Sequence, residues 1–437
     1  MLFRKIEEKI YEHLKTDDRI LIVEGARQVG KTFIIRETIK KIYENVIEIN
    51  FLEDSLNNKI FKNIANVKDF YFQLSMLYGD KMGNKENTII FIDEIQEYKE
   101  FITLLKFLKN DNKFSFIASG SLLGVTLSKI SSIPMGSIKI INMYPLDFEE
   151  FIIANGANHS FISELRNKMI NRISLDENSH NYLLDLFKKY LLIGGLPDAV
   201  KSYVEYFNIF KVREYHTEIH RYYIDDASKY DQERKLKIKL IYELTPSNLE
   251  NKKKRLVINK IENIKGKRFD DYEEEFDYLI NSGITLDVKA ISNPIFPLIQ
   301  STTKNLVKLY LNDVGLFTNI LYKNNINAIM NNQRSINLGS VYESVVAQEL
   351  KAHGHKLYYY DNRHNGEVDF IIDDYENLSV LPIEVKSGKD YQVHSALNKL
   401  MMNKEYNIFK SVVLSNERIV FEKDNILYLP IYYVMFL

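Results

Sequence analysis

The stretch Gly25-Ala-Arg-Gln-Val-Gly-Lys31-Thr32 fits the pattern G-x-x-x-x-G-K-[ST], and its flanks predict where it lies in the fold. An apolar run at residues 20–23 precedes it and residues 33–40 follow it, so the predicted order is buried strand, glycine-bounded loop and helix. In that order the N–H groups of the loop and the positive end of the helix converge on one point, where they can bind the β-phosphate of a nucleotide. We therefore predict a P-loop, with a chance glycine-rich turn as the alternative.

Two side chains of this loop have separate predicted tasks. Lys31 reaches the β- and γ-phosphates, and the Thr32 hydroxyl is a ligand for Mg²⁺. The predicted cofactors are therefore ATP and Mg²⁺. The predicted nucleotide-binding residues of the loop are Gly25, Ala26, Arg27, Gln28, Val29, Gly30, Lys31 and Thr32.

A second apolar run, Thr88-Ile-Ile-Phe-Ile-Asp93-Glu94, ends on two carboxylates. A continuous apolar run predicts a strand covered on both faces, as in a parallel sheet, whose last residues emerge at the edge where such sheets bind ligands. This is a Walker B pattern, in which Asp93 is predicted to hold Mg²⁺ and Glu94 to orient and polarise the attacking water. The alternative is a structural strand that ends in an acidic turn.

A third strand is predicted at residues 114–118 and runs into Ser119-Gly-Ser121. In P-loop ATPases that hydrolyse, a polar side chain at the end of the strand beside the Walker B strand often senses the γ-phosphate. Ser119 or Ser121 is the candidate for that role, and an ordinary Ser-Gly turn is the alternative.

The composition excludes some classes of protein but does not identify a binding partner. A chain of 437 residues predicts about two to four domains. The 58 Lys and Arg nearly cancel the 59 Asp and Glu, so a nucleic-acid-binding surface would have to be local. The chain has no cysteine, which excludes disulfides, thiolate zinc sites and a cysteine nucleophile. With no membrane-length apolar run and a charged amphipathic start, we expect a soluble cytoplasmic protein without a membrane partner.

These motifs and several further stretches resemble a family of prokaryotic AAA-type P-loop ATPases. Its members carry a C-terminal domain of unknown function that is similar to the PD-(D/E)xK nuclease fold. The resemblance extends over nearly the whole chain. The matching stretches are residues 25–32, 91–96, 119–123, 144–151, 194–197, 225–230 and 308–316.

One departure from the family pattern concerns the rate of hydrolysis. Many relatives have an arginine in the stretch that corresponds to residues 134–139, where this chain has Ser137 and Lys139. An arginine that stabilises charge on the transferring phosphoryl group raises the rate by about three to five orders of magnitude. Lys139 offers only a point charge in its place. The resemblance therefore implies slow hydrolysis, or an arginine from elsewhere, such as Arg221 or a partner.

The middle of the chain predicts two regions between the ATPase core at residues 1–145 and the C-terminal domain at 301–437. Residues 146–232 have a mainly helical pattern typical of a lid. Residues 233–300 predict a winged-helix-like module: a helix at 236–244, a turn and helix start at 245–248, an amphipathic helix, and a strand at 284–288. The cations predicted to contact DNA, with plain solvated surface as the alternative, are Lys252, Lys253, Lys254, Arg255, Lys265, Lys267 and Arg268.

The C-terminal domain predicts a second acidic site. A helix at 338–353 carries Glu343, and three strands in series follow it at 356–360, 367–372 and 381–386. Glu384 and Lys386 are two residues apart on one strand face, and hairpin pairing brings Asp369 alongside. Glu343, Asp369 and Glu384 are the predicted metal ligands, and Lys386 positions a water or steadies the phosphate. Together they resemble the full PD-(D/E)xK signature, with structural ion pairing as the alternative.

The predicted fold is α/β: an AAA-type P-loop parallel sheet, a helical lid, a winged-helix-like module and a restriction-endonuclease-like α/β domain. The predicted function is a Mg²⁺-dependent ATPase, with Lys31 and Glu94 as catalytic residues, that couples nucleotide state to the nuclease-like domain. One alternative is an ATP-gated, Mg²⁺-dependent DNA endonuclease with Asp369, Glu384 and Lys386 as catalytic residues. The other is a nucleotide-switched binding module with little hydrolysis. The sequence leaves open whether the partner is DNA or protein, and it gives no oligomeric state.

Overall fold

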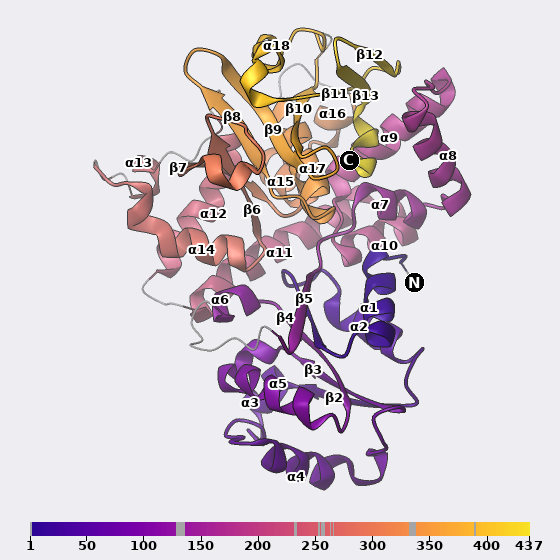
Figure 1. Cartoon of the computed structure of the whole chain (residues 1–437), viewed down its shortest axis with the longest axis vertical. Coiled ribbons are helices and arrows are strands. Elements are labelled where there is room, and N and C mark those ends of the chain that lie inside the picture. Colours follow the sequence, from indigo (N-terminus) through magenta and orange to yellow (C-terminus); the bar gives the residue numbers. More distant parts are fainter. Residues whose placement is uncertain are drawn as a thin grey trace. The chain divides into compact units, whose positions relative to one another are not determined.

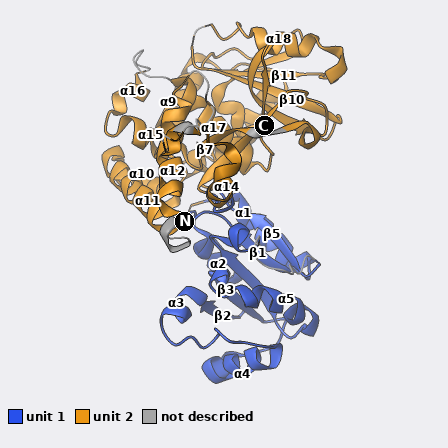
Figure 2. Ribbon diagram, turned by 90° about the vertical axis from the view of Figure 1, so that its left-hand side faces the viewer, with its two compact units in different colours: residues 1, 3–144, 281–283 blue, residues 2, 145–280, 284–437 orange. Residues whose placement is uncertain are grey.

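A computed structural model describes residues 2–127, 136–230, 234–251, 254, 258–262, 264, 266–331, 338–388 and 390–437. The chain divides into two compact units (Figure 2). Unit 1 comprises residues 3–144 and 281–283, and unit 2 comprises residues 145–280 and 284–437. Among the helices in the described part of the chain, none is long and apolar enough to cross a membrane.

Unit 1 is built on a five-stranded sheet in which every neighbouring pair of strands is parallel (Figure 1). Its strand order is β2-β3-β4-β1-β5. The strands are β1 (Ile20–Glu24), β2 (Asn45–Asn50), β3 (Thr88–Asp93), β4 (Ser115–Gly120) and β5 (Ile138–Asn142). Every residue of β3 is buried, as its continuous apolar run predicts. Because β3 and β1 both neighbour β4, the carboxyl ends of these three strands meet at one edge of the sheet.

The helices of unit 1 are α1 (Lys5–Thr16), α2 (Lys31–Ile39), α3 (Phe51–Leu56), α4 (Val67–Tyr78), α5 (Lys99–Asp111) and α6 (Leu123–Leu127). Helix α1 precedes the first strand of unit 1, and the other helices of this unit lie in the connections between strands. An aromatic cluster joins α3, α4 and α5: the rings of Phe51 and Phe70 lie 4.9 and 5.0 Å from that of Phe101, both edge to face. This packing fixes the start of α3 and with it the end of β2.

Unit 2 combines helices with one large sheet. Its helices are α7 (Phe148–Ala154), α8 (His159–Ile170), α9 (Glu177–Ile193), α10 (Pro197–Tyr206), α11 (Ile209–Tyr230), α12 (Lys235–Leu249), α13 (Asn259–Glu262), α14 (Glu273–Asn281), α15 (Val314–Tyr322), α16 (Ile326–Met330), α17 (Leu338–Ala352) and α18 (Ser395–Met402). The region predicted as helical, residues 146–232, contains α7 to α11.

The turn predicted at residues 245–248 is wrong, because α12 continues through it to Leu249. Two side chains support the backbone there: the Thr245 hydroxyl donates to the Ile241 carbonyl at 2.9 Å, and the Asn248 amide donates to the Leu244 carbonyl at 2.9 Å. Pro246 lies close to the end of the helix, so the N–H group that it lacks removes one bond from the final turns only. The helix therefore continues through Pro246, although proline usually marks a break in a helix.

The sheet of unit 2 has eight strands in the order β12-β13-β11-β10-β9-β8-β6-β7. They are β6 (Thr285–Ile291), β7 (Thr302–Leu311), β8 (Tyr358–Asn362), β9 (Gly366–Asp374), β10 (Ser379–Lys386), β11 (Ser411–Ser415), β12 (Phe421–Lys423) and β13 (Ile426–Pro430). The strand predicted within the winged-helix-like module is β6, which pairs with β7 and β8. One sheet therefore takes strands from both sides of residue 300, and the division into modules 146–232, 233–300 and 301–437 stays a prediction.

Helix α17 is the most buried helix of unit 2 and positions polar groups along its length. Towards its C-terminal end, the Gln348 side-chain oxygen accepts a hydrogen bond from the Val314 N–H at 2.8 Å. One turn from its end, Glu349 accepts from the Phe148 N–H at 2.9 Å and from the Tyr190 hydroxyl at 3.0 Å. These bonds join α17 to the starts of α7 and α15. The same helix carries Glu343 close to its beginning.

Candidate functional site

The loop at residues 25–32 has a backbone that depends on its glycines. A Cβ atom at Gly25 would lie 2.2 Å from the Met143 carbonyl oxygen, so no side chain fits there. Gly30 has φ 92°, in the left-handed region that glycine adopts without strain. Gln28 is also left-handed, at φ 66°, although it carries a side chain. The glycines therefore allow β1, the loop and α2 to follow one another directly, as the sequence predicts.

Lys31 begins α2 and is 6 % exposed. Its amine donates hydrogen bonds to the Gly25 and Ala26 carbonyls at 2.9 and 2.8 Å. Burial lowers the pKa of Lys31 to about 8, against the opposing influence of the Glu94 and Asp93 carboxylates. The structure thus places an ammonium group inside the loop, close to both carboxylates of β3.

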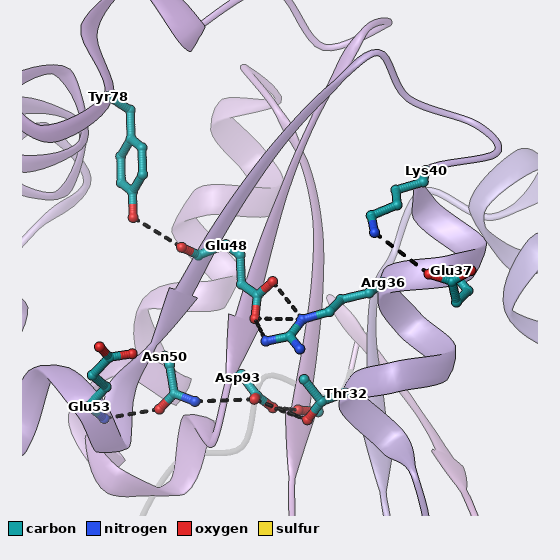
Figure 3. Close-up of polar contacts among 10 residues, drawn as sticks. Thr32, Arg36, Glu37, Lys40, Glu48, Asn50, Glu53, Tyr78 and Asp93 are labelled. Carbon is teal, nitrogen blue, oxygen red and sulfur yellow. Dashed lines mark hydrogen bonds and ion pairs between the residues drawn. The ribbon is translucent and has the colours of Figure 1, made fainter.

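Asp93 is the centre of a polar network at the carboxyl edge of the sheet (Figure 3). It accepts hydrogen bonds from the Thr32 hydroxyl at 3.0 and 3.1 Å, from the Ser119 hydroxyl, and from the Asn50 side-chain amide at 3.3 Å. Burial raises the pKa of Asp93, and the bonds from Ser119 and Thr32 oppose that rise. Three predicted residues, Thr32, Asp93 and Ser119, are therefore brought together.

Glu94 is held in a second, adjoining network. Its backbone is left-handed, with φ 53°, which turns the residue away from the line of β3. Its carboxylate accepts hydrogen bonds from the Ser121 hydroxyl at 3.1 Å and from the Gln96 side-chain amide. The Ser121 hydroxyl also lies 3.4 Å from Arg27 Nε. The two serines named as alternatives thus take different places, Ser119 beside Asp93 and Ser121 beside Glu94.

Sequence reasoning missed three residues of this site. Asn50 is the last residue of β2 and Gln96 follows the end of β3, and a prediction of the strand order would have placed Asn50 beside Asp93. Arg4 gives no such signal: it is buried, and its guanidinium donates to the Val29 carbonyl at 3.0 Å and to the Tyr144 carbonyl at 2.6 Å. Arg4 therefore holds the P-loop from a distant part of the sequence.

Lys139 lies at the wrong end of the sheet to replace an arginine near a phosphate. It pairs with Leu21 in the register of β5 with β1, and its amine is 4.0 Å from Asp17. Asp17 precedes β1, whereas the P-loop follows it. Ser137 is buried, and its carbonyl accepts a bond from the Ile20 N–H at the same end.

The second predicted site brings its residues together in unit 2. Glu343 comes from α17, Asp369 from β9, and Glu384 and Lys386 from β10. Asp369 accepts a hydrogen bond from the Val385 N–H at 2.8 Å, so the antiparallel pairing of β9 and β10 places it beside Glu384 as predicted. Lys386 Nζ lies 2.7 Å from Glu384 Oε1. We call Glu343, Asp369, Glu384 and Lys386 the acidic cluster.

In the acidic cluster Glu343 and Glu384 are buried, Asp369 is half-buried, and the three carboxylates repel one another. Glu384 is 7 % exposed, and burial together with the Asp369 charge raises its pKa to about 8. Burial and the charge of Asp369 also raise the pKa of Glu343. Within the described residues, Glu384 Oε2 has no hydrogen-bond partner, and no three His, Asp or Glu side chains converge closely enough to hold a metal ion.

Lys254 forms an ion pair with Glu343, so this carboxylate already has a cationic partner. Tyr310 donates to the other Glu343 oxygen at 3.3 Å. Lys254 was predicted to contact DNA, yet its side chain is only 18 % exposed and faces a carboxylate. Lys267 lies 3.4 Å from Asp271. Of the other predicted DNA contacts, Arg268 is exposed, and Lys252, Lys253, Arg255 and Lys265 lie outside the described residues.

Comparison with protein families matches three segments of the chain. An AAA domain matches residues 17–152, which contain the whole P-loop network. Two domains of unknown function match further along: DUF8612 at residues 184–327 and DUF4143 at residues 338–434. The second of these contains the acidic cluster.

Similar proteins were found among curated sequences and solved structures. The uncharacterized protein MJ1637 of Methanocaldococcus jannaschii is 24 % identical, over 97 % of this chain and 86 % of its own length. An uncharacterized protein of Haemophilus influenzae is 24 % identical over 43 % of this chain and 42 % of its own. The Walker-type ATPase PABY2304 of Pyrococcus abyssi has a TM-score of 0.45 and 15 % identity, covering 74 % of this chain and 96 % of that one. The Aeropyrum pernix ORC1 protein, solved in complex with DNA, has a TM-score of 0.32 and 15 % identity, covering 75 % and 94 %.

The family match and the geometry agree on the first part of the chain. The strand order places the P-loop after β1 and the Asp93-Glu94 pair after β3, on either side of β4. The AAA-domain match covers the same strands. Residues 17–152 of this protein therefore match an AAA domain and have the strand order and motif positions of a P-loop fold.

Proposed function

We propose that this protein binds MgATP at residues 25–32 and hydrolyses it. The observation that carries the proposal is the joint position of Lys31, Asp93 and Glu94 at one edge of the sheet. The Lys31 ammonium would contact the β- and γ-phosphates. Thr32 and Asp93 offer adjacent oxygen atoms of the kind that Mg²⁺ prefers, and they would hold the ion, which neutralises phosphate charge.

In this proposal Glu94 orients the attacking water. A carboxylate does so only if its own position is fixed, and the bonds from Ser121 and Gln96 fix one oxygen of Glu94. The other oxygen then accepts a hydrogen bond from water and polarises it. Ser119, bonded to Asp93, is placed to sense the nucleotide through the same carboxylate.

The test is phosphate release and MgATP affinity in three variants. Glu94→Gln should retain MgATP binding and lose turnover, and Lys31→Ala should lose binding. Glu97→Gln makes the same chemical change three residues further on and should keep both. Turnover in Glu94→Gln at the wild-type rate would refute the assigned role. A wild type that binds MgATP without releasing phosphate would favour the nucleotide-switched binding module instead.

A second activity is supported by the acidic cluster: we propose Mg²⁺-dependent DNA cleavage in unit 2, gated by ATP. The supporting observation is Glu384, which is buried and has one oxygen without a hydrogen-bond partner in the described residues. Mg²⁺ is commonly held by one or two carboxylates with waters, so Asp369 and Glu384 suffice as ligands. Bound metal would supply Lewis-acid activation of the phosphate. Lys386 would position the attacking water or steady the developing charge.

The test of cleavage is conversion of supercoiled plasmid to nicked circles with Mg²⁺, with and without ATP. Wild type should nick, and Lys386→Ala and Asp369→Ala should not. Lys410→Ala removes a lysine that pairs with Asp374, away from the acidic cluster, and should nick normally. Nicking by both cluster variants would assign the activity to a contaminant. If no protein nicks while ATP is turned over, the domain recognises a partner and does not cut.

A further inference from the structure

We propose that Arg27, within the P-loop itself, supplies the arginine that stabilises the transferring phosphoryl group, acting on the nucleotide of its own chain. The inference rests on the proposed ATP hydrolysis and goes beyond it, because it assigns the side chain that raises the rate. The sequence predicted only that the Arg27 backbone contributes to the loop.

The position of Arg27 is the first support. It lies between Gly25 and Lys31, is half-buried, and its Nε is 3.4 Å from the Ser121 hydroxyl. That hydroxyl donates to Glu94 at 3.1 Å. A single side chain therefore separates the guanidinium from the carboxylate that is proposed to orient water.

The second support is the charge distribution around Lys31. The Arg27 charge is one of the influences that lower the pKa of Lys31, so the two cations lie within electrostatic range of each other. Two cations and two carboxylates thus face the same region of the loop. The negative charge of a terminal phosphate there would relieve the repulsion between the cations, which favours its binding.

The third support is chemical. A guanidinium stays charged at all working pH values and presents a fork of N–H donors that matches phosphate oxygens. The corresponding charge cannot come from Lys139, which lies at the opposite end of β5. Arg27 is part of the nucleotide-binding loop, so no second chain is needed to supply an arginine.

The first experiment separates binding from turnover. Arg27→Ala should lower phosphate release by about three orders of magnitude or more while MgATP affinity changes by less than about tenfold. Arg27→Lys keeps the charge but not the fork, and should recover only a small part of the rate. Arg19→Ala removes an arginine that pairs with Asp17 before β1, and should leave the rate unchanged. ADP with aluminium fluoride, a mimic of the transferring group, should bind wild type tightly and Arg27→Ala poorly.

The second experiment tests whether the arginine acts within one chain. Arg27→Ala retains Glu94, and Glu94→Gln retains Arg27, so a mixture restores activity only if the arginine reaches a neighbouring chain. We expect the mixture to be no more active than the sum of its components. Recovery in the mixture, or wild-type turnover in Arg27→Ala alone, would overturn the proposal. A wild type without turnover would refute the hydrolysis proposal and this inference with it.

Discussion

Lys31 is a charged side chain that is buried beside the backbone groups to which it donates hydrogen bonds. Its amine is enclosed by loop carbonyls and is nearly inaccessible to water. Taking an ammonium out of water favours its neutral form, which is the cause of its lowered pKa. A bound phosphate favours the charged form. Nucleotide binding and the protonation of Lys31 are therefore linked.

This linkage predicts how MgATP affinity depends on pH. Below about pH 8 the amine is already charged in the free protein, so binding takes up no proton. Above that pH each binding event must protonate Lys31, and affinity should fall by about tenfold per pH unit. Titration of MgATP binding between pH 7 and 10 checks the slope, and Lys31→Arg should bind without it because arginine does not titrate there. A flat profile in wild type would contradict the prediction.

Lys254 and Glu343 predict an effect on stability. Removing one partner of a buried ion pair leaves the other charge uncompensated, which costs about 3 to 5 kcal/mol. Lys254→Met should therefore lower the free energy of unfolding by about that amount, measured by denaturant titration. Adding Glu343→Gln should restore part of the loss, because the buried charge is then gone. A loss equal to that of the exposed-lysine variant Lys410→Ala would show that the pair contributes nothing.

The residues that a local sequence pattern singled out and those that it missed differ in how far apart their partners lie. Lys31 and Thr32 belong to one local pattern, and Asp93 and Glu94 to another. Asn50 and Asp93 are 43 residues apart, and Lys254 and Glu343 are 89 apart. Such pairs depend on which elements become neighbours, and no local pattern specifies that.

At the scale of elements, Asp313 caps the start of α15 and also binds the turn that precedes α10. The Asp313 carboxylate accepts hydrogen bonds from the Gly195 N–H at 2.6 Å and the Leu316 N–H at 3.0 Å. A Cβ atom at Gly194, where φ is 69°, would lie 2.0 Å from Asp313 Oδ1. Only glycine leaves room for this carboxylate. The stretches at 194–197 and 308–316 therefore pack against each other and are joined by the Asp313 carboxylate.

The two backbone bonds that Asp313 accepts predict an unusually large loss of stability when it is replaced. Replacing a single capping residue by alanine typically costs about 1 kcal/mol. Asp313→Ala removes the cap of α15 and the bond to the Gly195 N–H at a buried position, and should cost clearly more, about 2 to 4 kcal/mol. Asp176→Ala removes one exposed cap, that of α9, and is the matched control. Equal losses of unfolding free energy in the two variants would contradict the shared role.

Elements with a continuous local pattern were predictable, and their partners were not. The apolar run of β3 and the strand-loop-helix order at the P-loop needed no tertiary information. The membership of β6 in the sheet of unit 2 depends on pairing with β8, far along the chain. The continuation of α12 past Pro246 depends on side-chain bonds that propensity does not include.

At the scale of the whole molecule, the chain carries a P-loop domain in unit 1 and an acidic cluster in unit 2. The proposed ATP gating requires that nucleotide binding changes the free energy of groups in unit 2. Such coupling has a typical size of about 1 to 3 kcal/mol and acts equally in both directions. A segment whose opening becomes less favourable by that amount exchanges its amide hydrogens more slowly.

Hydrogen exchange therefore tests the coupling directly. In Glu94→Gln, which should hold MgATP without turning it over, MgATP should slow exchange in the P-loop and also change exchange in β9 and β10. Lys31→Ala exposed to the same MgATP is the control, since it should show neither effect. Slower exchange in the P-loop with no change in β9 and β10 would mean that the two sites act independently. In that case the acidic cluster would respond to its own ligand alone, and any nuclease activity would not be gated by ATP.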